Sequence, residues 1–152
     1  MGICSTTELH NKAPKNLKEM GMEQILKQLT LEDYFGKGKH KITPEEFFEK
    51  EDCFLLDVRS REEADTISIK MNCHANVESR NIPLNEVPDR INEIPKEKFI
   101  GIFCTTHVRS GIVFAYLLSK GFSDVRIIEG GFPALTGALK PGKILKASKN
   151  KG

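Results

Sequence analysis

The sequence lacks the features that mark membrane-spanning and secreted proteins. No run of apolar residues approaches the ~20 that a helix needs to cross a bilayer. The first residues also lack the apolar core of a secretory signal peptide, so export is not indicated. We therefore expect a cytoplasmic protein without a transmembrane segment.

Cysteine is scarce and irregularly spaced. The four cysteines include no CxxC pair, which argues against a zinc finger and, in a reducing compartment, against a disulfide framework. We expect reduced thiols, and the sequence predicts neither a metal site nor another cofactor.

The chain also lacks a strong excess of charge of either sign. Its 23 lysines and arginines stand against 21 aspartates and glutamates, and the net charge is +2. This excess is too small to indicate a nucleic-acid-binding protein, and no nucleic-acid partner is expected. Lysines do gather in residues 141–152, which we interpret as a basic, flexible tail.

The residues that are present fit one domain with an extension. Hydrophobic residues make up 39% of the 152 residues, enough for a single domain with its own core. We expect an N-terminal extension over 1–38, helical within 14–35, where Gly21 could divide the helix. The compact domain would cover 39–140. The extension could pack on this domain or on a second copy, forming a homodimer, and the sequence does not choose.

Short apolar runs alternate with helical patterns through the compact domain. Strands are expected at 41–43, 53–58, 99–103 and 125–128. Helices are expected after the capping residues Thr43 and Ser60, over 84–94, from Ser110 to Lys120 and over 132–139. This alternation predicts an α/β fold with a largely parallel sheet.

Three expected strands end in residues of chemical interest. Asp57 closes one strand, Cys104 follows another, and Gly130-Gly131 follows a third. Because sites in parallel sheets lie at the carboxyl ends of the strands, we expect these residues to meet at one edge.

The stretch from Phe99 to Ser110 carries the strongest functional signal. It predicts a buried strand that ends at Cys104, a short loop that closes on Arg109, and a helix that begins near Ser110. Loop amides and the helix dipole favour an anion at such a place, and the same field lowers a thiol pKa. A thiolate there would be a nucleophile, and Arg109 suits an oxyanion. The alternative is a buried, inert cysteine.

At these residues the chain resembles the rhodanese family of sulfurtransferases, whose active site has the pattern strand-Cys-x4-Arg-Ser-helix. The resemblance extends over roughly residues 40–140. Leu55-Leu56-Asp57-Val58-Arg59 is similar to the first buried strand of the family and its Asp-Val-Arg signature. Asn81-Ile82-Pro83-Leu84, Gly121-Phe122-Ser123-Asp124-Val125 and Glu129-Gly130-Gly131-Phe132 are similar to later segments.

The resemblance implies a central parallel five-stranded sheet flanked by helices. It also implies that Cys104 takes sulfane sulfur from a small anionic donor, such as thiosulfate or polysulfide, and passes it from a persulfide to cyanide or a thiol. Arg109 would orient the donor. The other implied site residues are Thr105, Thr106, His107 and Val108, which supply loop amides, and Asp57, Arg59 and Ser110, which support the loop.

The chain departs from the family within this loop. Family loops often contain glycine and extra cations, whereas this loop reads Thr-Thr-His-Val. His107 could tune the thiolate or contact a donor, or simply face solvent. Cys73 could attack a persulfide on Cys104, or be a buried structural cysteine.

Two further functions stay open. A non-catalytic rhodanese-like module that binds a partner is one, and the N-terminal extension would serve it. A cysteine phosphatase or arsenate reductase is the other, although such loops typically place five residues between cysteine and arginine. The four residues present here favour sulfur transfer.

Overall fold

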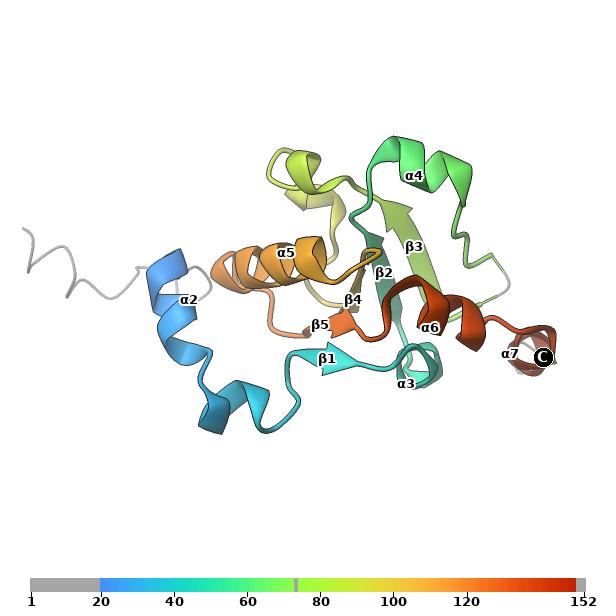
Figure 1. Cartoon of the computed structure of the whole chain (residues 1–152), viewed down its shortest axis with the longest axis horizontal. Helices are drawn as coiled ribbons and strands as arrows, with labels where there is room; N and C mark the ends of the chain where they lie inside the picture. The colour runs from blue at the N-terminus through green and yellow to red at the C-terminus, as the bar shows by residue number, and fades with distance from the viewer. Residues whose placement is uncertain (1–19, 73, 150–152) are drawn as a thin grey trace, which may run out of the picture.

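The computed structural model describes residues 20–72 and 74–149 (Figure 1). Their centre is a five-stranded sheet in the order β1-β5-β4-β2-β3, and all neighbouring strands are parallel. The strands are β1 (Lys41–Ile42), β2 (Cys53–Asp57), β3 (Val77–Asn81), β4 (Phe99–Phe103) and β5 (Val125–Ile128). The predicted α/β fold with a parallel sheet is therefore confirmed.

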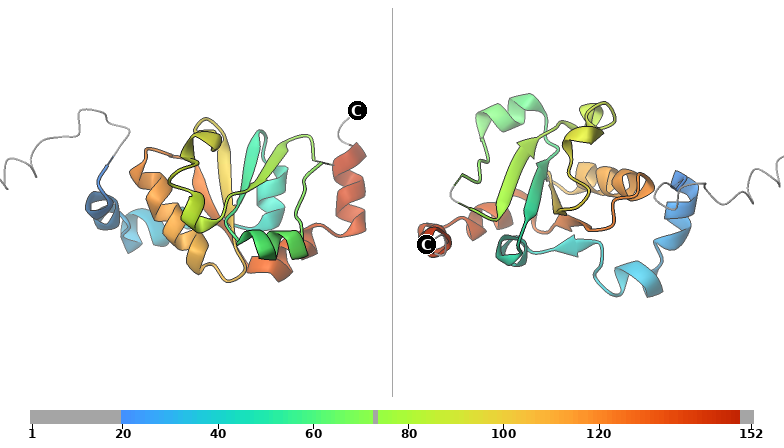
Figure 2. Two further views of the ribbon diagram at one scale, coloured as in Figure 1. Left: turned by 90° about the horizontal axis from the view of Figure 1, so that it is seen from above. Right: turned by 180° about the vertical axis from the view of Figure 1, so that it is seen from behind.

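Helices cover both faces of the sheet. They are α2 (Met22–Gln28), α3 (Pro44–Glu49), α4 (Arg61–Thr66), α5 (Val108–Ser119), α6 (Gly131–Ala138) and α7 (Pro141–Lys149). The view from above in Figure 2 shows the sheet between α5 on one side and α3 and α6 on the other. The sheet is thus buried on both faces, as a parallel sheet requires.

The core has two parts because β2 alternates its side chains between the faces. Phe54 and Leu56 join the cluster under α5, while Cys53 and Leu55 join the cluster under α3 and α6. All five residues of β2 are buried. This explains why the strand reads as a continuous apolar run rather than an alternating one.

Capping residues set several helix ends as predicted. The Thr43 hydroxyl accepts from the Glu46 N–H at 3.2 Å, and Ser60 accepts from the Glu63 N–H at 3.3 Å. At the end of α5, Gly121 has φ +83°. Its N–H donates to the Leu118 carbonyl at 3.1 Å, a glycine cap that closes the helix.

The helix predicted over 84–94 is wrong. The segment forms two short 3₁₀ turns, η2 (Leu84–Glu86) and η3 (Ile91–Glu93). Pro88 lies between them, and it lacks the N–H that an α-helix would need at this point. Two apolar residues of this segment, Val87 and Ile94, are nevertheless buried in the cluster under α5.

The described part of the tail predicted at 141–152 forms a helix, α7. Pro141 stands at the first position of this helix, where proline is favoured because the first turn has no use for its missing N–H. Lys143 of α7 pairs with Glu45 of α3 at 2.8 Å, an exposed contact between this helix and the domain. Residues 150–152 lie outside the described part.

The described part of the N-terminal extension packs on the domain. Gly21 caps α2, and a π-helical turn, η1 (Leu31–Phe35), follows it. The Met20 N–H donates to the Ser119 carbonyl at the end of α5 at 3.0 Å. Residues 14–19 of the predicted helix lie outside the described residues, and the homodimer stays a prediction.

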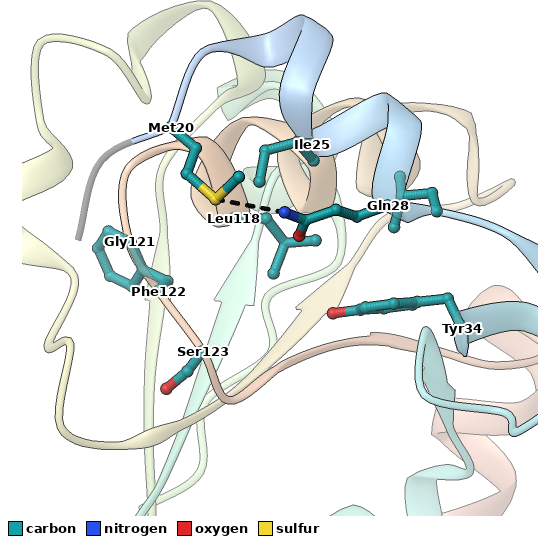
Figure 3. Close-up of a pocket in the computed structure, with 9 residues that line it drawn as sticks. Met20, Ile25, Gln28, Tyr34, Leu118, Gly121, Phe122 and Ser123 are labelled. Carbon is teal, nitrogen blue, oxygen red and sulfur yellow. Dashed lines mark hydrogen bonds between the residues drawn. The ribbon is translucent and has the colours of Figure 1, made fainter. Parts of the chain in front are cut away.

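A cavity of about 260 Å³ lies between the extension and the domain (Figure 3). Its lining includes Ile25 from α2, Tyr34 from η1, and Leu118 and Phe122 from the end of α5 and the following loop. Across residues 20–149 apart from 73, no helix combines the length and the apolar character that a bilayer span requires.

Candidate active site

The carboxyl ends of three neighbouring strands bring the predicted site residues together. Asp57 ends β2, Cys104 directly follows β4, and Gly130 and Gly131 follow β5. The Val58 N–H, just past β2, donates to the Phe103 carbonyl at 2.9 Å, so the two strand ends are held in register beside the cysteine.

Cys104 lies at the base of the loop, at the N-terminus of α5. The residue is 1% exposed, whereas the four residues that follow it are exposed. Helix α5 begins at Val108, two residues earlier than expected, so Ser110 is inside its first turn. The Ser110 N–H donates to Cys104 Sγ at 3.4 Å. The sulfur therefore occupies the position at a helix N-terminus where backbone donors stabilise negative charge.

The loop turns at His107 without a glycine. His107 has φ +68°, in the left-handed region that glycine adopts readily and other residues rarely do. This histidine caps α5 through its backbone position alone, because its side chain makes no capping hydrogen bond. The exposed imidazole is thus held at the mouth of the loop.

Gly131 supports the loop from the neighbouring strand end. It has φ +59°, and a Cβ at this position would lie 2.4 Å from the Thr105 carbonyl oxygen. Only a residue without a side chain lets the turn after β5 approach the loop this closely. Gly131 therefore has a packing role in the site.

Arg109 is engaged by a carboxylate that the sequence reasoning did not place in the site. Its Nη1 donates to Glu63 Oε2 at 2.6 Å and its Nη2 to Oε1 at 2.9 Å. Glu63 Oε1 also accepts from the Thr105 hydroxyl at 3.3 Å. The same carboxylate accepts from the Ser60 N–H at 2.9 Å, completing the capping box of α4.

This pairing shifts both partners toward their charged forms. Hydrogen bonds from Arg109, and then from the Ser60 backbone, hold the pKa of Glu63 well below its usual range. The hydrogen bond with Glu63 in turn raises the pKa of Arg109. In the sequence, Glu63 is recognisable only as the residue three positions after the capping residue Ser60, and this local pattern does not indicate a long-range partner.

Asp57 and Arg59 form a buried ion pair beneath the loop. Arg59 Nε and Nη2 donate to the two Asp57 oxygens at 2.9 and 2.7 Å, and both side chains are under 10% exposed. Arg59 Nη2 also donates to the Ile67 carbonyl at 2.9 Å. The guanidinium lies over the rings of Phe103 and Phe132. Both charged groups are fully used inside the fold, which suits a supporting position.

Ser110 presents a polar group with unused capacity. Its residue is fully buried, and its hydroxyl has no hydrogen-bond partner among the described residues. Buried hydroxyls are usually paired, so an orphan one beside a nucleophile calls for an explanation.

The other described cysteine lies away from this edge. Cys53 begins β2, at the opposite end of the strand from Asp57, and burial raises its pKa to about 11. Cys73, the other predicted thiol, lies outside the described residues. Across the described ranges, no three His, Cys, Asp or Glu side chains gather into a metal-binding group.

The comparisons with known proteins agree on one family. Residues 44–138 match the rhodanese-like domain. The chain is 31% identical over 121 residues to the uncharacterized protein YqhL of Bacillus subtilis, a match spanning 80% of this chain and 81% of that protein. It is also 31% identical over 84 residues to a sulfurtransferase of Allochromatium vinosum, spanning 55% of this chain and 72% of that protein.

Some relatives are much longer. The match to the tRNA sulfurtransferase of Photorhabdus laumondii is 32% identical over 73 residues, 48% of this chain and only 14% of that protein. Among solved structures, a rhodanese-related protein of Thermoplasma volcanium has a TM-score of 0.53 and 25% identity, over 67% of this chain and 95% of that one. These matches confirm the resemblance seen in the sequence, and the chain belongs to the rhodanese-like domain family.

Proposed function

We propose that this protein is a sulfurtransferase that carries sulfane sulfur as a persulfide on Cys104. One observation carries the proposal: Cys104 Sγ lies at the N-terminus of α5 and accepts the Ser110 N–H at 3.4 Å. An anionic sulfur is stabilised there before and after it gains a second sulfur atom. A relative from Allochromatium vinosum is named a sulfurtransferase, which supports sulfur transfer as the class of reaction.

The first half of the reaction loads the cysteine. The Cys104 thiolate attacks the outer sulfur of a donor such as thiosulfate, the S–S bond of the donor breaks, and sulfite leaves with the bonding electrons. Cys104 then carries a persulfide. Negative charge shifts to the leaving group during this step. The backbone N–H groups of the loop residues Thr105, Thr106 and His107 and the N-terminus of α5 would stabilise that charge.

The second half unloads it. An acceptor, either cyanide or a thiolate, attacks the outer persulfide sulfur and leaves with it as thiocyanate or a new persulfide. The Cys104 thiolate is regenerated, and no external oxidant or reductant is consumed. Asp57 and Arg59 keep the strand ends under the loop in place through their buried pair, while Arg109 lies at the mouth of the loop, paired with Glu63.

Mass spectrometry tests this mechanism directly. We would treat the purified protein with thiosulfate and with polysulfide, measure the intact mass, and map any added sulfur by peptide. The wild-type protein should gain one sulfur atom on Cys104 and lose it on addition of cyanide. Cys104→Ser should gain none, whereas Cys53→Ala should behave like the wild type because that thiol is buried at the far edge.

Failure of Cys104 to gain sulfur would contradict the proposal. If the Cys104 thiol is reactive but takes sulfur from no donor, the proposed sulfurtransferase activity is excluded. Hydrolysis of a phosphate monoester and, with a thiol reductant added, reduction of arsenate would then be measured, and after those the binding of a protein partner.

A further inference from the structure

We propose that Glu63 determines which sulfur donors the site accepts: by neutralising Arg109, it favours singly charged donors such as persulfides and thiosulfonates over the thiosulfate dianion. This inference rests on the proposed function, because it concerns the loading of Cys104. It identifies a specificity-determining residue outside the loop and narrows the substrate class.

Glu63 occupies the groups that would otherwise receive an anion. Both terminal nitrogens of Arg109 donate to it, at 2.6 and 2.9 Å, in the two-pronged geometry that an oxyanion would use. The Thr105 hydroxyl, on the first loop residue after Cys104, also donates to it at 3.3 Å. An anionic donor that approaches Arg109 must therefore displace a carboxylate that is already well bound.

The loop has no second cation to compensate. Between Cys104 and Ser110, Arg109 is the one lysine or arginine in the sequence. The nearby guanidinium of Arg59 is buried and paired with the Asp57 carboxylate. Val108, next to Arg109 at the start of α5, adds an apolar side chain that is 67% exposed. The mouth of the site is thus neutral or apolar rather than cationic.

What remains to attract an anion is the backbone. The N-terminus of a helix carries roughly half a positive charge, and the Ser110 N–H already faces the sulfur. This field suits one negative charge on the sulfur being transferred. A second charge, as in the sulfonate oxygens of thiosulfate, would face the Glu63 carboxylate and be repelled by it.

The loading step differs between the two donor classes only in charge. With thiosulfate, the Cys104 thiolate forms a bond to the outer sulfur and the doubly charged sulfite leaves. With methanethiosulfonate, the same S–S bond forms and breaks in the same way, and the singly charged methanesulfinate leaves. The two donors match closely in size because a methyl group replaces one charged oxygen.

The experiment compares these two donors on three proteins. The rate of persulfide formation on Cys104 is measured with each donor to give kcat/KM for the wild type, Glu63→Gln and Glu62→Gln. Glutamine at position 63 keeps the capping box of α4, since its side chain still accepts from the Ser60 N–H. Glu62 lies beside it in the same first turn, whereas the side-chain hydrogen bonds of Arg109 go to Glu63, so Glu62 is the matched control.

We expect the wild type to favour methanethiosulfonate, and Glu63→Gln to move the ratio of the two kcat/KM values toward thiosulfate by about tenfold, the size that loss of one partly exposed charge supports. Glu62→Gln should keep the wild-type ratio. A variant that is merely less stable would lower both rates together and leave the ratio unchanged, so the ratio isolates the charge effect.

The outcomes separate the two proposals. If the wild type loads sulfur but Glu63→Gln leaves the ratio unchanged, or moves it away from thiosulfate, Glu63 does not select donors by charge and this inference is overturned alone. If the wild type loads sulfur from neither donor, the proposed function is overturned, and this inference with it.

Discussion

Ser110 contacts Cys104 through its backbone while its own hydroxyl stays unpaired. The N–H donates to Sγ at 3.4 Å, and the buried Oγ has no partner in the described part of the chain. Burying a polar group without a hydrogen bond costs ~1–3 kcal/mol. A second sulfur on Cys104 would place a new acceptor beside this residue, so the persulfide form can recover a cost that the reduced form carries.

Ser110→Ala should therefore act oppositely on the two forms. The reduced protein should be as stable as the wild type or up to ~1 kcal/mol more stable, because no hydrogen bond is lost. The rise in Tm on sulfur loading should be smaller than in the wild type. Ser119→Ala is the control, since that hydroxyl is paired with the Tyr116 carbonyl at 2.6 Å and its loss should cost ~1 kcal/mol in both forms. A clear loss of stability in reduced Ser110→Ala would contradict this account.

Asp57→Asn should be strongly destabilising. It leaves the Arg59 guanidinium buried without its counter-charge, and breaking a buried pair from one side costs about 3–5 kcal/mol. Urea unfolding measures this loss. The exposed pair between Glu45 and Lys143 gives the comparison: Glu45→Gln should cost less than ~1 kcal/mol. Equal costs for the two variants would mean that the buried pair does not hold the strand ends.

Acid should weaken the contact between Glu63 and Arg109. The pKa of Glu63 is lower in the folded protein than in the unfolded chain, so its contribution to stability is full at neutral pH. As pH falls below the unfolded value of about 4.3, the unfolded chain takes up the proton first, and the contribution is lost progressively. The stability difference between wild type and Glu63→Gln should thus shrink from pH 6 to pH 3. A difference that stays constant over this range would show that the charge on Glu63 does not stabilise the fold.

Two glycines of α6 should respond in opposite directions to alanine. Gly131→Ala places a Cβ 2.4 Å from the Thr105 carbonyl oxygen at φ +59°, so it should destabilise the protein and slow sulfur loading by displacing the loop. Gly137→Ala meets no described atom within 4 Å and should stabilise α6 by ~0.5–1 kcal/mol. Thermal unfolding and the loading rate of both variants check this pair. Normal loading by Gly131→Ala would mean that the loop tolerates the displacement.

Local sequence patterns were sufficient to locate the strands whose two faces are both buried. The apolar runs at 53–58, 99–103 and 125–128 correspond to β2, β4 and β5 because inner strands of a parallel sheet are covered on both faces. The resemblance implied a fifth strand, but no local pattern located β3, since its sequence Val-Glu-Ser-Arg-Asn is mostly polar. It forms at the edge of the sheet, where its pairing with β2 supplies the order that its side chains do not indicate.

Local sequence patterns also explain which site residues were predicted and which were not. Cys104, Arg109 and Ser110 share one short motif, so spacing alone predicted that they would be neighbours. Glu63 reaches Arg109 only because α4 and α5 both begin at the same edge of the sheet, a relationship that no local pattern contains. The left-handed turn at His107 was hidden because the residue is not a glycine.

The sheet order also determines how the site would open. Strand β4, which leads to Cys104, pairs with β2 on one side and β5 on the other. Exposing its amides to solvent requires breaking two ladders at once, whereas β1 and β3 each have one. Hydrogen exchange should therefore be slow along Phe99–Phe103, as along the other inner strands, and fast over the exposed residues 105–107 that follow. Cys104 lies at this boundary, directly after a strand that we expect to exchange slowly and directly before a loop that we expect to exchange fast.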